Sequence, residues 1–217
     1  MMKFCTYLLA ATLICTAGAA SAFAQAGGAM GMSAPAAAFD YKAKFLDDMK
    51  DLESKFLGLA QATPQDKYTW RPGEGVRSNA EVFLHVAGGN FIFPGMMGAK
   101  PPENYKQQGY ETSTTDKAEI ISQLKTSFAY IDSAIANMPP DELAKPRKGF
   151  GGSSTTGYGI LFLITTDLHE HLGQAIAYAR VNNIVPPWTA ERQAARGNAA
   201  GGAARGAGGA PPAKPNN

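Results

Sequence analysis

The most constraining feature of the sequence is a long apolar pattern of helical period near its C-terminal end. Between residues 154 and 183, apolar side chains recur three and four positions apart, which predicts one amphipathic helix. Asp167 falls in line with Ile160 and Ile164, so its carboxylate is expected on the buried face of this helix. A buried carboxylate needs a hydrogen-bond partner or a cation. The segment therefore predicts a packed helical protein with a polar site inside it.

Three earlier segments share this periodicity and predict three more helices, over residues 36–60, 78–93 and 116–138. Ser78 followed by Glu81 matches a capping box at the start of the second helix. The connection over residues 95–115 is long enough to be a crossover. The sequence contains no alternating strand pattern of useful length and no internal repeat. We therefore expect an all-α fold, a four-helix bundle with long crossover connections.

The N-terminal end has the three parts of a secretory signal peptide, over residues 1–24. Lys3 supplies a positive start, an apolar run follows, and the A-F-A triplet gives a small-residue cleavage site. The alternative is a membrane anchor, but the apolar run is short and small residues follow it. We expect cleavage before Gln25 and a protein that is exported, either periplasmic or secreted. Residues 25–37 would then be a flexible lead-in.

Both cysteines, Cys5 and Cys15, lie inside the predicted signal peptide. The mature protein is therefore expected to lack disulfides, a cysteine nucleophile and cysteine metal ligands. Its core alone has to stabilise the fold, and the remaining candidate ligands are histidines and acidic residues.

The folded domain is expected over residues 38–189, followed by a disordered tail over residues 190–217. The tail consists almost entirely of Ala, Gly, Pro, Asn and Arg and has no apolar periodicity. Between residues 25 and 189 there are 15 Lys and Arg against 17 Asp and Glu. This near-neutral balance gives no indication of a nucleic-acid surface.

Three side chains on two of the predicted helices form the candidate metal site: His85, Asp167 and His171. Asp167 and His171 are four residues apart, so they lie one above the other on one helical face. His85 lies among apolar residues of the second helix. Helical bundles build metal sites from inward side chains on facing helices. Two imidazoles and one carboxylate are the ligand set of catalytic zinc sites and of non-haem Fe(II) sites.

Several neighbours of this site have two open roles each. Glu81, four residues before His85, is either a helix cap or a group that orients or joins the site. Gln174, one turn beyond His171, is a candidate to bind a ligand or orient that histidine. Three aromatic residues either line a pocket or belong to the core: Tyr68, Trp70 and Tyr178. His169 is expected on the surface, because it points away from His171 on an ideal helix.

Four short motifs together resemble the DinB-like superfamily, of DinB/YfiT type. They are DKYTWRPGEGVRS at 66–78, EVFLHVA at 81–87, HLGQ at 171–174 and VPPW at 185–188. The resemblance implies a four-helix bundle that binds a divalent metal through one His on the second helix and two ligands on the last long helix. Carried over by position, these ligands are His85, Asp167 and His171. Many members have His, and isomerase relatives Glu, where this chain has Asp167, so zinc, nickel, iron and manganese all remain candidates.

The resemblance also implies a function, a metal-dependent thiol transferase or isomerase, or a hydrolase. The alternatives are a non-catalytic metal- or small-molecule-binding bundle and a structural bundle that has lost its metal. The expected partner is a small-molecule substrate whose identity the sequence does not give. We expect no nucleic acid, no membrane association after signal cleavage, and a homodimer as in many relatives.

Overall fold

The computed structural model describes residues 39–206, and side chains up to residue 197. The predicted signal peptide and lead-in, at residues 1–37, lie outside the described residues, as does the end of the chain from residue 207. Within the described part, none of the helices combines the length and the apolarity needed to cross a membrane.

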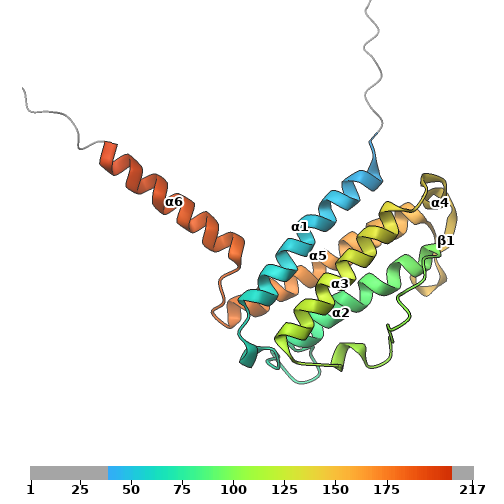
Figure 1. The fold of residues 1–217 in the computed structure, drawn as a ribbon, viewed down its shortest axis with the longest axis horizontal. Helices are drawn as coiled ribbons and strands as arrows, with labels where there is room; N and C mark the ends of the chain where they lie inside the picture. Colours follow the sequence, from blue (N-terminus) through green and yellow to red (C-terminus); the bar gives the residue numbers. More distant parts are fainter. Residues whose placement is uncertain (1–38, 207–217) are drawn as a thin grey trace, which may run out of the picture. The chain divides into compact units, whose positions relative to one another are not determined.

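Four long helices form the bundle that the sequence predicts (Figure 1). They are α1 (Tyr41–Ala62), α2 (Asn79–Ile92), α3 (Lys117–Ala136) and α5 (Gly157–Val181). Helices α3 and α5 each pack against both α1 and α2. Consecutive helices α1 and α2 therefore lie diagonally across the bundle, and α2 lies beside α5. The connections from α1 to α2 and from α3 to α5 have to be long, because each joins two helices that are not neighbours in space.

The connections contain short elements of their own. Between α1 and α2 lies η1 (Gln65–Lys67), and between α2 and α3 lie η2 (Phe93–Met97) and η3 (Tyr110–Thr112). Between α3 and α5 lie α4 (Pro140–Ala144), β1 (Pro146–Lys148), η4 (Phe150–Gly152) and β2 (Ser154–Thr156). The two strands pair antiparallel. Strands of three residues are too short for an alternating pattern to be detected in the sequence, which explains why the sequence did not predict them.

Side-chain caps fix where the helices begin. At α2, the Ser78 hydroxyl accepts the Glu81 backbone N–H at 3.3 Å, and Glu81 Oε2 accepts the Ser78 backbone N–H at 2.6 Å. The predicted capping box is therefore confirmed. At α5, the Thr156 hydroxyl accepts the Gly159 backbone N–H at 3.3 Å, close to the predicted start. These caps set the position of His85 in the second turn of α2 and of Asp167 in the middle of α5.

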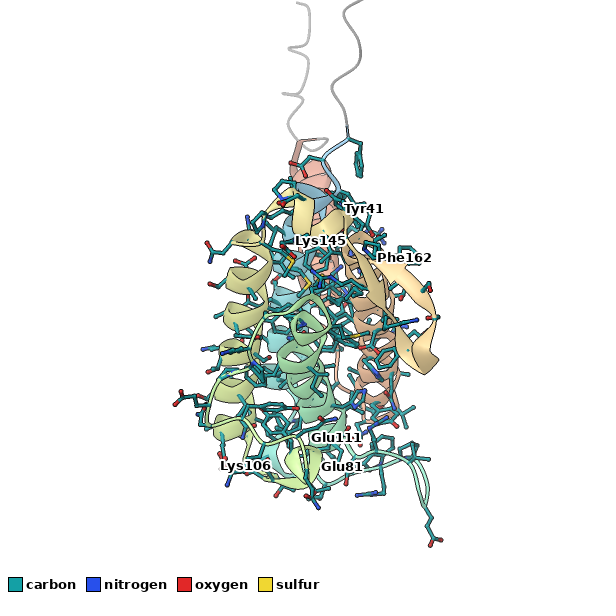
Figure 2. All side chains as sticks on the ribbon, turned by 90° about the vertical axis from the view of Figure 1, so that its right-hand side faces the viewer. Tyr41, Glu81, Lys106, Glu111, Lys145 and Phe162 are labelled. Carbon is teal, nitrogen blue, oxygen red and sulfur yellow. The ribbon has the colours of Figure 1, made fainter. Side chains whose placement is uncertain are left out.

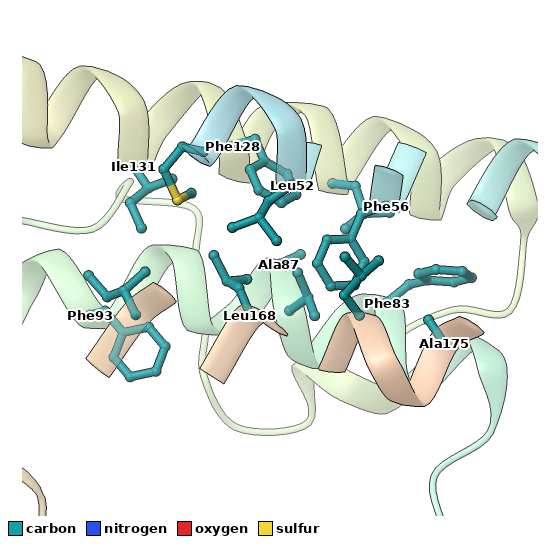
Figure 3. Close-up of a cluster of buried hydrophobic side chains, with 14 of the residues drawn as sticks. Leu52, Phe56, Phe83, Ala87, Phe93, Phe128, Ile131, Leu168 and Ala175 are labelled. Carbon is teal, nitrogen blue, oxygen red and sulfur yellow. The ribbon is translucent and has the colours of Figure 1, made fainter. Parts of the chain in front are cut away.

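The core lies between the four long helices and is built from aliphatic and aromatic side chains (Figure 3). Phe56 and Phe128 pack with ring centroids 6.0 Å apart, and both are buried. Tyr68 closes one end of this core: it is fully buried, and its hydroxyl donates to the Ala60 carbonyl at 2.8 Å. Its hydrogen bond satisfies one of the free carbonyls in the last turn of α1.

The C-terminal segment differs from the prediction of disorder, because α6 forms over Pro187–Gly206. Ala, Arg, Gln and Glu all have high intrinsic helix propensity, and this local preference outweighs the lack of an apolar stripe. Residues 190–197 are exposed, so this part of α6 has no buried face. The beginning of the helix is anchored: Trp188 packs against the core, and Pro187 lies beside Gly58 of α1.

Candidate functional site

Helices α2 and α5 bring His85, Asp167 and His171 together. One ligand atom from each of the three lies within 4.8 Å of the other two. His171 Nε2 is 3.6 Å from Asp167 Oδ1, and the two imidazole rings meet edge to face with centroids 4.4 Å apart. All three side chains are half-buried, so the cluster is held by the bundle but remains open on one side.

A hydrogen bond at Nδ1 orients each imidazole. His85 Nδ1 lies 2.5 Å from Glu111 Oε1, and His171 Nδ1 lies 3.1 Å from Gln174 Oε1. Because a carboxylate or amide oxygen only accepts, each Nδ1 carries the proton in the neutral ring. The lone pair is then on Nε2, and this tautomer allows each histidine to bind a metal through Nε2.

Glu111 is the residue that the sequence did not indicate. It lies on η3, in the long connection between α2 and α3, and Arg77 Nε donates to its Oε2 at 2.7 Å. Burial raises the pKa of the Glu111 carboxyl, but the hydrogen bonds from Arg77 and His85 outweigh burial and hold that pKa below its usual value. Glu111 is therefore ionised at neutral pH and gives His85 a negatively charged acceptor.

The neighbouring carboxylate also favours positive charge at His171. The Asp167 carboxylate, with Oδ1 3.6 Å from His171 Nε2, raises the pKa of His171, and this effect outweighs burial, which lowers it. A proton and a divalent cation compete for the same Nε2 atom. The negative charge that stabilises the imidazolium would also stabilise a bound cation.

The structure separates the other predicted site residues into two groups. Gln174 orients His171 as described, and its Nε2 donates to the Tyr178 hydroxyl at 3.0 Å. Trp70 packs edge to face on Tyr178 with centroids 5.3 Å apart. Trp70 and Tyr178 therefore support Gln174, which in turn orients His171.

Glu81 and Tyr68 do not reach the site. Glu81 caps α2 and accepts from Arg71 at 3.1 Å, while Tyr68 belongs to the core. Figure 2 shows Glu81 and Glu111 toward the same end of the bundle, but only Glu111 is bonded to His85. His169 is exposed, as predicted.

A cavity of about 240 Å³ opens beside His85 and Asp167. Its other lining residues are Gly88, Gly89, Ile92, Phe93, Tyr105, Gln107, Tyr110, Glu111 and Phe150. The two glycines allow aromatic rings to lie close to α2: a Cβ on Gly88 would be 3.3 Å from the Tyr110 ring, and one on Gly89 would be 3.1 Å from the Phe93 ring. None of the predicted aromatic pocket residues lines this cavity.

The donor set fits a divalent metal ion. Two neutral imidazole nitrogens and one carboxylate oxygen leave coordination positions open toward the cavity. Among the described residues, this is the one cluster of at least three histidine, cysteine or acidic side chains close enough to share an ion.

Comparison by sequence identifies one family. The model of the DinB superfamily matches residues 49–175, which is more than half of the chain and includes all three clustered residues. Comparison with curated proteins by sequence gives no match.

Comparison with solved structures finds bundles of the same fold. A DinB-like protein from Bacillus cereus ATCC 10987 is 14% identical with a TM-score of 0.59, and the match covers 68% of this chain and 98% of that one. YfiT from Bacillus subtilis, described as a probable metal-dependent hydrolase with an unusual four-helix bundle topology, is 13% identical with a TM-score of 0.53. That match covers 72% of this chain and 97% of YfiT.

A third similar structure is the mycothiol-dependent maleylpyruvate isomerase. It is 12% identical with a TM-score of 0.51, over 60% of this chain and 59% of the isomerase. At these identities the likeness is one of fold.

Proposed function

This chain belongs to the DinB superfamily, and from that premise we propose that it binds a divalent metal ion through His85, Asp167 and His171 and acts as a metal-dependent hydrolase. When bound at such a site, a divalent cation lowers the pKa of a water molecule and supplies a nucleophile near neutral pH. The cavity beside the cluster gives a small substrate access to that position.

One observation carries this proposal: both imidazoles are hydrogen-bonded at Nδ1, so that both Nε2 lone pairs are free. A histidine with a purely structural role is satisfied by any hydrogen bond and does not need to leave the same nitrogen free as its neighbour. The fixed acceptors Glu111 and Gln174 also keep the rings from turning, which preserves the relative position of the two nitrogens.

Hydrolysis is favoured over thiol chemistry for two reasons. YfiT, which shares the fold over almost its whole length, is described as a probable metal-dependent hydrolase. Export, expected from residues 1–24, would also separate the protein from cytosolic thiols, whereas water is available everywhere. The fold similarity to the mycothiol-dependent isomerase keeps thiol transfer as the second candidate, and the two differ in whether a thiol is needed for turnover.

The test uses a matched pair of histidine variants. His171→Ala removes a proposed ligand, and His169→Ala removes an exposed histidine two residues away on the same helix. Metal-free protein is titrated with Zn²⁺, Co²⁺, Ni²⁺ and Mn²⁺, and hydrolysis of phenyl acetate is then measured without and with an added thiol.

Wild type and His169→Ala should bind one ion per chain and hydrolyse the ester without thiol, and His171→Ala should lose both properties. Absence of stoichiometric metal would overturn the metal site. Metal binding combined with an ester rate that His171→Ala leaves unchanged would overturn the hydrolase and favour a non-catalytic binding protein.

We also propose that residues 1–24 direct export. Expression of the full chain followed by cell fractionation should place the protein outside the cytoplasm, with Gln25 as the first residue by mass spectrometry. An intact Met1 terminus on a cytoplasmic protein would contradict export.

A further inference from the structure

The cavity beside the clustered histidines and Asp167 has aromatic walls from three parts of the chain. Tyr105 and Tyr110, in the connection between α2 and α3, pack edge to face with centroids 5.0 Å apart. Phe93 at the start of η2 and Phe150 in η4 pack in the same way at 5.9 Å. Ile92 completes the apolar surface. Such walls bind flat or apolar groups and offer little to a strongly hydrated one.

The side-chain charges around this cavity act against an anionic ligand in the metal-free protein. No Lys or Arg is among the residues that line it in the described part of the chain. The charged groups that do line it are the carboxylates of Glu111 and Asp167. Arg77 is the nearby cation, and it is bonded to Glu111. In the metal-free protein, a further negative charge placed among the aromatic rings would therefore lose its hydration without gaining a positive partner.

A neighbouring cavity makes the contrast clear. This second space, of about 430 Å³, lies on α3 and the same connection and also has Tyr105 and Tyr110 in its lining. Its remaining lining is largely polar and includes Lys106, Glu119 and Gln123. The two tyrosines therefore line both cavities: the polar one, and the more apolar one beside His85 and Asp167. The cation of this region, Lys106, lines the second cavity and not the one beside the proposed metal site.

We infer that the proposed hydrolase acts on a small uncharged ester or amide whose body is aromatic or aliphatic. The body would lie between the Phe93–Phe150 pair and the Tyr105–Tyr110 pair, with its carbonyl toward His85 and Asp167. Water adds to the carbonyl carbon, the bond from that carbon to the leaving oxygen or nitrogen breaks, and a proton from water passes to the leaving group. The volume of about 240 Å³ lies below the roughly 300–1,000 Å³ of pockets for drug-sized ligands, so the substrate is small.

This inference rests on the proposed function, but its first test does not need the metal. Benzamide and benzoate have nearly the same shape and differ in charge. Their binding to metal-free protein is measured by ligand-observed NMR titration. Benzamide should bind at least about tenfold more tightly than benzoate, because only benzoate places an unpaired charge against the carboxylates. Equal or tighter binding of benzoate would overturn the inference.

Two phenylalanine variants test the location of binding. Phe150 and Phe162 are both 62% exposed, so neither truncation removes a core side chain. Phe150 lines the cavity, whereas Phe162 lies on α5 outside that lining and toward the end of the bundle opposite Glu111 (Figure 2). Phe150→Ala should weaken benzamide binding about three- to tenfold, the usual effect of losing one aromatic contact. Phe162→Ala should leave it unchanged, and an equal loss in both variants would overturn the location.

A kinetic comparison separates this inference from the proposed function. Metal-loaded protein is tested with phenyl acetate and with 4-acetoxybenzoate, which adds a carboxylate to the same ester. A kcat/KM at least about tenfold higher for phenyl acetate supports an uncharged substrate. Equal kcat/KM values for the two esters would overturn the uncharged substrate class and leave hydrolysis established. If neither ester is hydrolysed but benzamide still binds more tightly than benzoate, the result would count against the hydrolase and not against the apolar pocket.

Discussion

Replacing Glu111 by Gln should weaken metal binding, although Glu111 contributes no ligand atom to the cluster. Gln keeps the size of the side chain and can still accept from His85 Nδ1, but it removes the negative charge. Hydrogen bonds to charged groups contribute about 1.5–3 kcal/mol and neutral ones about 1 kcal/mol. Glu111 is 39% exposed, so solvent screening places the loss at the lower end, about 1 kcal/mol.

A second effect comes from Arg77. In the Gln variant this guanidinium loses the carboxylate that it now contacts at 2.7 Å and faces the cation site without a counter-charge. Together the two effects should raise the Kd for the metal about tenfold, equivalent to ~1.4 kcal/mol. This value is at the lower end of the roughly 10- to 100-fold seen when the partner of a ligating histidine is removed.

The assay is a competition titration of Co²⁺ or Zn²⁺ against a chelator of known affinity, at fixed pH and salt. Glu81→Gln is the matched control: it also removes a carboxylate that is paired with an arginine, close to the same end of α2. Because Glu81 does not contact His85, that variant should bind metal as the wild type does. Wild-type affinity in Glu111→Gln, or an equal loss in the Glu81 control, would refute the orienting role of Glu111.

Three further outcomes are expected. Glu81→Gln should lower the free energy of unfolding by about 1 kcal/mol at pH 7, or Tm by roughly 2–4 °C. Burial raises the pKa of the Glu81 carboxyl, but hydrogen bonds from Ser78 and Arg71 outweigh burial and hold that pKa below 4.5. The stability difference should therefore shrink as the pH falls below 4.5 and through the folded-state pKa, and an unchanged difference at pH 3 would contradict this prediction. Tyr68→Phe should cost about 1–2 kcal/mol in denaturant unfolding, because the Ala60 carbonyl loses its donor in a buried position, and an unchanged midpoint would argue against that bond. Ending the chain after Ala190 should leave Tm unchanged within about 1 °C, since residues 190–197 are exposed, and a clear drop by calorimetry would mean that the part of α6 beyond Ala190 packs on the bundle.

The parts of the fold that could be predicted from the sequence are those that depend on local chemistry. The Ser78–Glu81 capping box involves residues three positions apart, and the apolar period of α5 lies within one segment. The pairing of Asp167 with His171 follows from helical geometry alone, and His85 was placed on the buried face by its apolar neighbours. These features do not depend on how the chain crosses over.

The remaining features depend on contacts between distant segments. Glu111 lies in a connection without periodicity, and only the folding of that connection onto α2 brings it to His85. Phe150 and Tyr105 also reach the cavity only because their connections fold onto the bundle. Tyr68, which precedes a proline- and glycine-rich loop, instead folds into the core. The α6 helix was missed for a different reason. Its Ala, Arg, Gln and Glu residues favour a helix locally, but the prediction relied on apolar periodicity, which this segment lacks.

The packing of α2 against α5, which is not the next long helix in the chain, has a consequence for folding and for metal binding. The helix that follows α2 in sequence is α3, but the ligands are on α2 and α5, so no pair of consecutive long helices contains the whole cluster. A partly folded chain therefore has no complete site, and contacts between distant segments have to form first, which slows folding. Metal at a hundredfold excess over its Kd would add about 2.7 kcal/mol to global stability. Chelation should thus shift one cooperative unfolding transition of the whole bundle, and not release a single helix.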